Sequence, residues 1–312
     1  MLVRYLARRL LQILPVLVGI SIVVFLLIRL IPGDPARAML GTRATPDLIA
    51  RLHAQFGLDK PIWEQYLSFL GGAVHGQFGV SFFYQAPVGE LVLARLPVTM
   101  ELLAYAAVLS IALALPLALL AALRRGGAMD QGIRLLFAGS LGLPAFWLGI
   151  LLALVLGVNL GLFPVSGTGN GGLDTVWHLT LPAFTIALSI TPIIGRSLRS
   201  SLIEVLRADF VTTGRAAGLS DRAITLTYVL RNSLLPTVTI LSVNMGWLIG
   251  GTVIVEQVFG LPGLGSILIS SIATRDYAII QGVTLVLALF VVLVNLVTDL
   301  LYAALDPRVV LG

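Results

Sequence analysis

Residues 102–123 read LLAYAAVLSIALALPLALLAAL, a run of 22 positions without a charged side chain. Glu101 precedes this run, and Arg124 and Arg125 close it. A helix of about 20 apolar residues spans the hydrocarbon core of a bilayer, whereas an isolated strand would leave its backbone groups unpaired in lipid. Residues 102–123 therefore predict a transmembrane helix.

Five further charge-free intervals have the length of a transmembrane helix. They are residues 10–28, 135–158, 175–195, 232–255 and 277–298, and the third belongs to an uncharged stretch that is expected to break near Asn159. The composition agrees, since 58% of the 312 residues are hydrophobic and 11% are charged, against about a quarter charged in soluble domains. We expect an all-α polytopic membrane protein with six transmembrane helices, over residues 10–31, 98–123, 135–158, 178–195, 232–256 and 277–299.

The loop charges predict the orientation. An even number of spans places both termini on one side of the membrane. With Arg29, Glu101 and Glu256 assigned to outer helix ends, the terminal side carries 13 basic and 6 acidic residues, and the opposite side 7 basic and 9 acidic. Because cytoplasmic loops are enriched in basic residues, we expect both termini in the cytoplasm. The main cytoplasmic segments are then residues 1–9, 196–231 and 300–312, and the external ones 32–97, 159–177 and 257–276.

Residues 32–97 are expected to form a small external domain, because a plain connection between two helices needs far fewer residues. Thr45 to Gly57 has the spacing and the end signals of an amphipathic helix, and Pro61 to Leu70 carries a second amphipathic pattern. Two compatible roles remain open for this domain: a folded cap on the outer helix ends, and a docking surface for an external partner.

Residues 159–177 are rich in glycine, which predicts a mobile external loop. A passive linker fits this composition, and so does a candidate external gate or a contact for a binding protein. The candidate residues are Gly167, Gly169, Gly171 and Gly172.

Residues 196–231 carry most of the cytoplasmic charge and show the signals of two short helices. Asp209 to Gly218 predicts one helix that turns at Gly218, and Ser220 can cap a second. A loop that is only solvated would need neither Phe210 nor Val211. We therefore expect a compact helical element outside the membrane.

Several short motifs follow one another along the chain. They are Pro32-Gly33-Asp34-Pro35, Gly57-Leu58-Asp59-Lys60-Pro61, Gly76-Gln77-Phe78-Gly79-Val80-Ser81, Gly214-Arg215-Ala216-Ala217-Gly218-Leu219-Ser220, Leu230-Arg231-Asn232-Ser233-Leu234-Leu235-Pro236, Val255-Glu256-Gln257-Val258-Phe259, Pro262-Gly263-Leu264-Gly265, Arg275-Asp276-Tyr277, Gln281-Gly282 and Asp306-Pro307-Arg308. In their order and spacing the chain resembles permease subunits of bacterial ABC importers of the dipeptide, oligopeptide, glutathione and nickel group, specifically the first of their two permeases.

The resemblance implies that residues 209–236 are the coupling element that sits in a groove of an ATP-binding subunit. The residues it implicates are Asp209, Phe210, Arg215, Gly218, Leu219, Arg231, Asn232 and Pro236. The usual family pattern has alanine and lysine where this chain has Gly214 and Ala217. The resemblance also implies the bacterial cytoplasmic (inner) membrane and, as partners, a second homologous permease, two ATP-binding subunits and an extracytoplasmic solute-binding protein. Family frequency makes di- and oligopeptides the first expectation for the solute.

The residues themselves predict that any ATPase is a separate chain. The only lysine is Lys60, which is expected outside, and the sequence has no phosphate-binding loop of the type GxxxxGK[ST]. The chain has no cysteine, its three histidines are scattered, and its arginines form no basic stripe for nucleic acid. We therefore expect a transport subunit that is not an enzyme and binds no cofactor, metal or nucleic acid.

Two alternatives are a self-contained secondary transporter or channel, and a membrane-anchored scaffold. A carrier driven by protons or sodium normally places ionisable residues near the middle of its spans. Glu101, Glu256 and Asp299 lie close to span ends instead. The two halves of the chain also show no convincing inverted repeat. These observations favour a subunit that depends on a separate ATPase.

Overall fold

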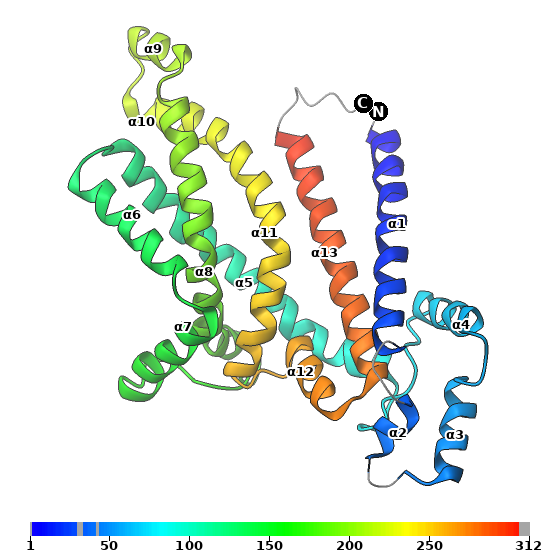
Figure 1. Ribbon diagram of the computed structural model, residues 1–312. Helices are drawn as coiled ribbons and strands as arrows, with labels where there is room; N and C mark the ends of the chain where they lie inside the picture. The colour runs from blue at the N-terminus through cyan, green and yellow to red at the C-terminus, as the bar shows by residue number, and fades with distance from the viewer. Residues whose placement is uncertain (1, 30–33, 42–43, 306–312) are drawn as a thin grey trace. The chain divides into compact units, whose positions relative to one another are not determined.

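The structure, a computed structural model, describes residues 2–29, 34–41 and 44–305 and is helical almost throughout these ranges. Within them, β-structure is limited to one isolated bridge between Val80 and Pro87. The elements in chain order (Figure 1) are α1 (Leu2–Arg29), α2 (Pro35–Leu40), α3 (Pro46–Phe56), α4 (Ile62–Val74), α5 (Val88–Leu123), α6 (Ala128–Leu141), α7 (Ala145–Leu152), the π-helix η2 (Ala153–Asn159), α8 (Leu173–Val205), α9 (Asp209–Ala216), α10 (Asp221–Ala223), the π-helix η3 (Ile224–Val229), α11 (Leu230–Val258), α12 (Leu264–Thr274) and α13 (Tyr277–Leu305). The expected end of the first span at residues 30–31, the Pro32-Gly33 half of the first motif and residues 306–312 lie outside the described residues.

Two compact units divide the chain, and each joins segments that are distant in sequence. Unit 1 combines Met1–Thr99 with Pro262–Val292, and unit 2 combines Met100–Leu261 with Leu293–Gly312. The units are described separately below.

In unit 1 the segment before α5 is bound to the start of α13. Asp276 is buried, and its carboxylate accepts hydrogen bonds from the Ser81 hydroxyl (2.6 Å) and the Phe83 amide (3.0 Å). Gly282, in the second turn of α13, lies so close to this segment that a Cβ there would be 3.0 Å from Cβ of Phe78, and 2.7 Å from Cγ1 of Val88 at the start of α5. Two of the sequence motifs, Gly76 to Ser81 and Arg275 to Tyr277, therefore belong to one packed region.

In unit 2, α8 is the central helix and packs against α6, α7 and α11. α6 approaches α8 so closely that a Cβ on Gly195 would overlap the ring of the buried Phe137. A second group of buried side chains joins the ends of α5 and α8 to the residues that follow α8. We call it the inner cluster, and it consists of Ala118, Ala122, Leu198, Leu202, Val211, Ile224 and Val229.

The expected span over residues 135–158 is not one straight helix. α6 ends at Leu141, α7 begins at Ala145, and the two segments are bent by 104°. Pro144 stands at the break; proline lacks a backbone donor and pushes the preceding residue toward extended conformations, so the helix ends there. The second break follows Asn159, where η2 ends.

Three described helices are long and apolar enough to cross a membrane unbroken: Val88–Leu123, Leu173–Val205 and Tyr277–Thr298. The bent pair that starts with α6 is a fourth when it is taken as one span. Shorter apolar helical segments are Leu11–Leu26, Gly246–Val258 and Leu264–Thr274. These helices confirm the all-α class of a multi-pass membrane protein, while the number of six spans and their orientation stay predictions.

Candidate functional site

Residues 209–219 form the short helix and turn that the sequence predicts. α9 is followed by Gly218, whose φ is +83°. The Gly218 amide donates to the Arg215 carbonyl (3.0 Å), and the Leu219 amide donates to the Gly214 carbonyl (3.1 Å). These two hydrogen bonds define a Schellman ending, which requires a left-handed residue and favours glycine there. Figure 1 shows α9 at the end of α8, projecting beyond the long helices of its unit.

One side of α9 is anchored and another is open. Val211 is fully buried in the inner cluster, among side chains of α5 and α8. Phe210 and Leu219 are each 43% exposed. The element is therefore fixed to two long helices and still presents two apolar side chains to its surroundings.

The second short helix that the sequence predicts is the first turn of a long one. Ser220 caps it as expected, accepting a hydrogen bond from the Ala223 amide (3.3 Å). α10, η3 and α11 then follow one another without a break from Asp221 to Val258. The reason is that neither glycine nor proline occurs between Ser220 and Pro236 to end the helix. The expected boundary between a coupling segment and a fifth span at residue 232 is thus not a helix end.

The polar side chains of the turn contact each other. The Arg215 guanidinium donates to the Asp221 carboxylate over 2.8 Å, and both side chains are more than half exposed. An exposed ion pair of this kind contributes little stability, so both groups stay accessible to a partner. Asp209 is exposed in the first turn of α9.

The remaining predicted coupling residues lie on α11. Arg231 and Asn232 are exposed, and Nδ2 of the Asn232 side chain donates to the Tyr228 carbonyl one turn earlier (2.8 Å). Pro236 lies further along the same helix. The structure thus brings residues 209–221 together around one turn and places these three residues on the helix that leaves it.

Asp130 and Arg199 form a largely buried ion pair that the sequence did not reveal. The guanidinium of Arg199 donates twice to the carboxylate of Asp130, at 2.7 and 2.6 Å, and the Gly126 amide donates to the same carboxylate (2.9 Å). Asp130 is only 1% exposed. This pair fixes the start of α6 to α8, two turns before α8 ends. Both residues were visible only as loop charges, because 69 positions separate them in the sequence.

A hydrogen bond joins the glycine-rich loop to the start of α8. Gly167, Gly169, Gly171 and Gly172 all have positive φ values between +61° and +102°. The Asn170 amide donates to Oδ2 of Asp174 (2.7 Å), and a Cβ on Gly169 would lie 2.7 Å from the same oxygen. These positions therefore need glycine for their backbone conformation, and Asp174 at the start of α8 holds the loop.

A large cavity lies between α6, α7, α8 and α11 of unit 2. Its volume is about 1150 Å³, and its walls are mainly apolar side chains of these helices, including Trp247. Ser140, Ser189 and Asn244 supply its polar side-chain groups, and each donates a hydrogen bond to the backbone of its own helix. Among the described residues that line it, none is charged. Hydropathy could not locate this cavity, because it does not reveal how each helix is rotated.

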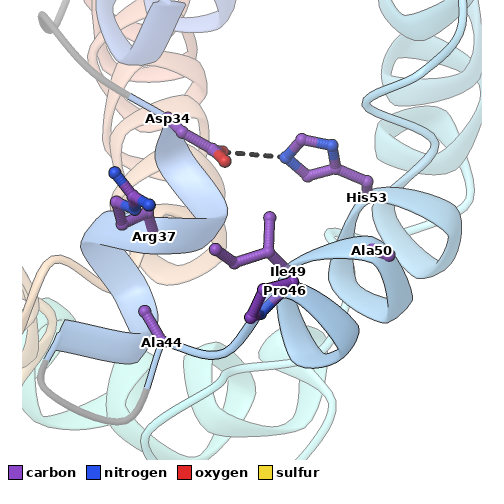
Figure 2. A pocket seen from close by; sticks show the side chains of 7 residues that line it. All are labelled: Asp34, Arg37, Ala44, Pro46, Ile49, Ala50 and His53. Carbon is purple, nitrogen blue, oxygen red and sulfur yellow. Dashed lines mark hydrogen bonds and ion pairs between the residues drawn. The ribbon is translucent and has the colours of Figure 1, made fainter.

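A smaller pocket of about 440 Å³ lies in unit 1 between α2 and α3. Figure 2 shows Asp34 and His53 facing each other across it, with Arg37 on the side of α2. Nε2 of His53 lies 2.8 Å from Asp34, and Nδ1 lies 3.3 Å from Asp59. No group of three or more His, Cys, Asp or Glu among the described residues has the arrangement of a metal site.

Known proteins match the chain over nearly its whole length. Residues 114–311 match the family described as binding-protein-dependent transport system inner membrane component, and residues 1–103 match the family of N-terminal regions of such membrane components. An oligopeptide transport system permease protein of Bacillus subtilis is 38% identical over 311 residues, covering 98% of each chain. The dipeptide transport system permease protein and the glutathione transport system permease protein of Escherichia coli K12 are each 35% identical, again over 98% of both chains.

A solved structure shows the same fold. The chain resembles a subunit of the MetNI methionine ABC transporter, crystallised in inward-facing conformations, with a TM-score of 0.59 and 17% identity over 69% of this chain and 96% of that one. The sequence matches and the likeness of fold are consistent with each other. The chain therefore belongs to the family of inner membrane components of binding-protein-dependent transport systems.

Proposed function

We propose that the chain is one of two permease subunits of an ATP-driven importer and couples to separate ATPase subunits through α9 and its turn. The observation that carries this proposal is the construction of α9. Val211 anchors it in the inner cluster, while Phe210 and Leu219 are open to a partner. A protein that grips these two side chains also moves the ends of α5 and α8.

The buried contacts support rigid transmission from α9. The Asp130–Arg199 ion pair ties the start of α6 to the part of α8 that also contributes to the inner cluster. When the ATPases close on ATP, α9, α8 and α6 then move as one body. Alternating access requires only such rigid-body rocking of one helix bundle against another.

The proposed topology has six spans with both termini in the cytoplasm, as the charge distribution predicts. In this topology α9 is cytoplasmic, and the glycine-rich loop and residues 32–97 are external. The sole lysine, Lys60, would be external too, so ATP hydrolysis falls to partner chains. The external segments would contact a solute-binding protein, and deletion of residues 168–172 is expected to reduce uptake.

The cavity between α6 and α11 is proposed as this subunit's share of the solute path. Its uncharged walls would let solutes of either charge pass, which leaves selection to the binding protein. The relatives transport dipeptides, oligopeptides and glutathione according to their names, so we propose peptides and related small solutes as cargo.

The proposal is tested by purifying the chain from its native membrane and reconstituting it in liposomes. We expect a second permease and one or two kinds of ATPase to co-purify, and peptide uptake to require all of them, the binding protein and ATP. A chain that moves solute alone and without ATP would be a secondary transporter or channel, and the proposal would be wrong.

A further inference from the structure

Helix α4 packs against the apolar part of α1. The Tyr66 hydroxyl lies 2.8 Å from the Ser21 hydroxyl, and the ring of Phe25 contacts the rings of Tyr66 and Phe69, with centroids 5.2 and 5.8 Å apart. Ser21 and Phe25 are buried by this contact. Figure 1 shows α4 beside the lower end of α1.

A second stripe of α4 is apolar and exposed. Trp63, Leu67 and Val74 are 60%, 58% and 77% exposed. Their spacing of four and seven residues places them on one face of the helix, next to the face that Tyr66 and Phe69 present to α1. None of the α4 residues, all of which the structure describes, is fully buried.

The opposite side of α4 is polar. Glu64 and Ser68 are four residues apart and lie on the far side from α1. Gln65 donates hydrogen bonds to the carbonyls of Leu58 and Lys60, which ties the start of α4 to the turn before it. An apolar half and a polar half of this kind are typical of a helix that lies in the plane of a membrane interface.

The depth of α4 along α1 points to lipid as the partner. Ser21 and Phe25 lie within the apolar segment Leu11–Leu26, and α1 continues for only eight residues from Ser21 to Arg29, about 12 Å at 1.5 Å per residue. α1 also exposes Ile22, Val23 and Leu26 beside the contact. The exposed stripe of α4 thus continues the apolar surface of a helix that is proposed to span the membrane.

We propose that α4 is an interfacial helix whose stripe of Trp63, Leu67 and Val74 lies in the outer leaflet, at the boundary between head groups and acyl chains. Tryptophan is enriched at this depth because its ring is amphipathic. α4 carries no basic residue, so its partner is the apolar layer of the lipid and not an anionic head group. The helix then holds residues 32–97 at a set height on the bilayer. The inference rests on the proposed topology and not on coupling to ATP.

The absence of cysteine from the chain makes a direct test possible. Leu67→Cys and Val74→Cys are each labelled with a nitroxide in the full importer, reconstituted in phosphatidylcholine vesicles. Glu64→Cys and Ser68→Cys are the matched controls on the polar side of the same helix. Power saturation then compares collisions of each label with dissolved oxygen, which concentrates in lipid, and with a water-soluble nickel chelate.

We expect labels at positions 67 and 74 to show a several-fold higher ratio of oxygen to chelate collisions than labels at 64 and 68. Equal ratios on the two sides would overturn the proposal, since the stripe would then face water. Low collision rates with both reagents at 67 and 74 would also overturn it, because a protein partner would then cover the stripe.

An independent measurement avoids labels in α4. In a variant with Trp147, Trp177 and Trp247 changed to Phe, brominated phosphatidylcholine should quench the fluorescence of Trp63 strongly. Absence of quenching would contradict the interfacial position. Neither measurement depends on ATP hydrolysis or on transport, so their failure is distinct from a failure of ATP-driven uptake.

Discussion

His53 lies between two carboxylates, at 2.8 Å from Asp34 and 3.3 Å from Asp59 (Figure 2). A neutral imidazole carries one N–H and can donate to only one of them, whereas the protonated ring donates to both. The hydrogen bond to Asp34 accordingly raises the pKa of His53 above its ordinary value. Burial opposes ionisation of Asp34, but hydrogen bonds from His53 and the Ala36 amide outweigh it and hold the pKa of Asp34 below its ordinary value.

These shifts predict a pH-dependent contribution of His53 to stability. Because the folded state raises the pKa of His53, its contribution is complete below the unfolded value of about 6.5 and is lost as the pH rises through the folded value. Thermal unfolding of His53→Gln and of the unchanged chain should therefore differ most below the unfolded pKa of about 6.5 and converge as the pH rises through the raised, folded pKa. A gap that stays constant or widens with rising pH would contradict this assignment.

Neutralising Asp130 in its ion pair with Arg199 is expected to lower the free energy of unfolding strongly. Asp130→Asn leaves Arg199, whose side chain is only 17% exposed, without its charged partner, and we expect a destabilisation of about 3 kcal/mol. Asp209→Asn is the matched control, since Asp209 is exposed at the start of α9. Thermal unfolding in detergent measures both variants, and equal midpoints would show that the ion pair does not stabilise the fold.

At the scale of elements, the turn after α9 is where sequence and structure agree best. Gly218 and Ser220 are local signals, and both act as the sequence predicts. The bend between α6 and α7 was missed for an equally physical reason. Hydropathy measures the preference of a stretch for lipid and not its direction, so residues 135–158 read as one span although Gly142 and Pro144 lie within it.

We expect a change from glycine to alanine to have opposite effects on stability at Gly218, in the turn, and at Gly214, inside α9. Gly218→Ala places a side chain at φ +83°, and we expect a loss of about 1 kcal/mol. Gly214→Ala puts the residue of the usual family pattern inside α9, where its Cβ would meet Ile224 at an ordinary 3.4 Å. Because alanine favours the helix, we expect a gain of about 0.5 kcal/mol. Unfolding midpoints that fall equally in both variants would contradict the different backbone roles.

At the scale of the whole molecule, composition and loop charges were sufficient to predict a helical membrane protein. The family comparison and the long apolar helices confirm that class. The cavity, the Asp130–Arg199 pair and the exposed stripe of α4 could not be predicted, because each depends on how helices distant in the sequence are rotated and packed. One signal of the α4 stripe was present, since Trp63 and Leu67 belong to the amphipathic pattern that starts at Pro61.

The central claim is that separate ATPases drive this subunit through α9. The most direct measurement is ATP hydrolysis stimulated by the loaded binding protein, in the reconstituted importer, for Phe210→Ala and for its control Thr212→Ala on another face of α9. We predict that Phe210→Ala loses most of the stimulation while the control keeps it and both assemblies unfold at the same temperature. Full stimulation in the Phe210→Ala importer would contradict the account.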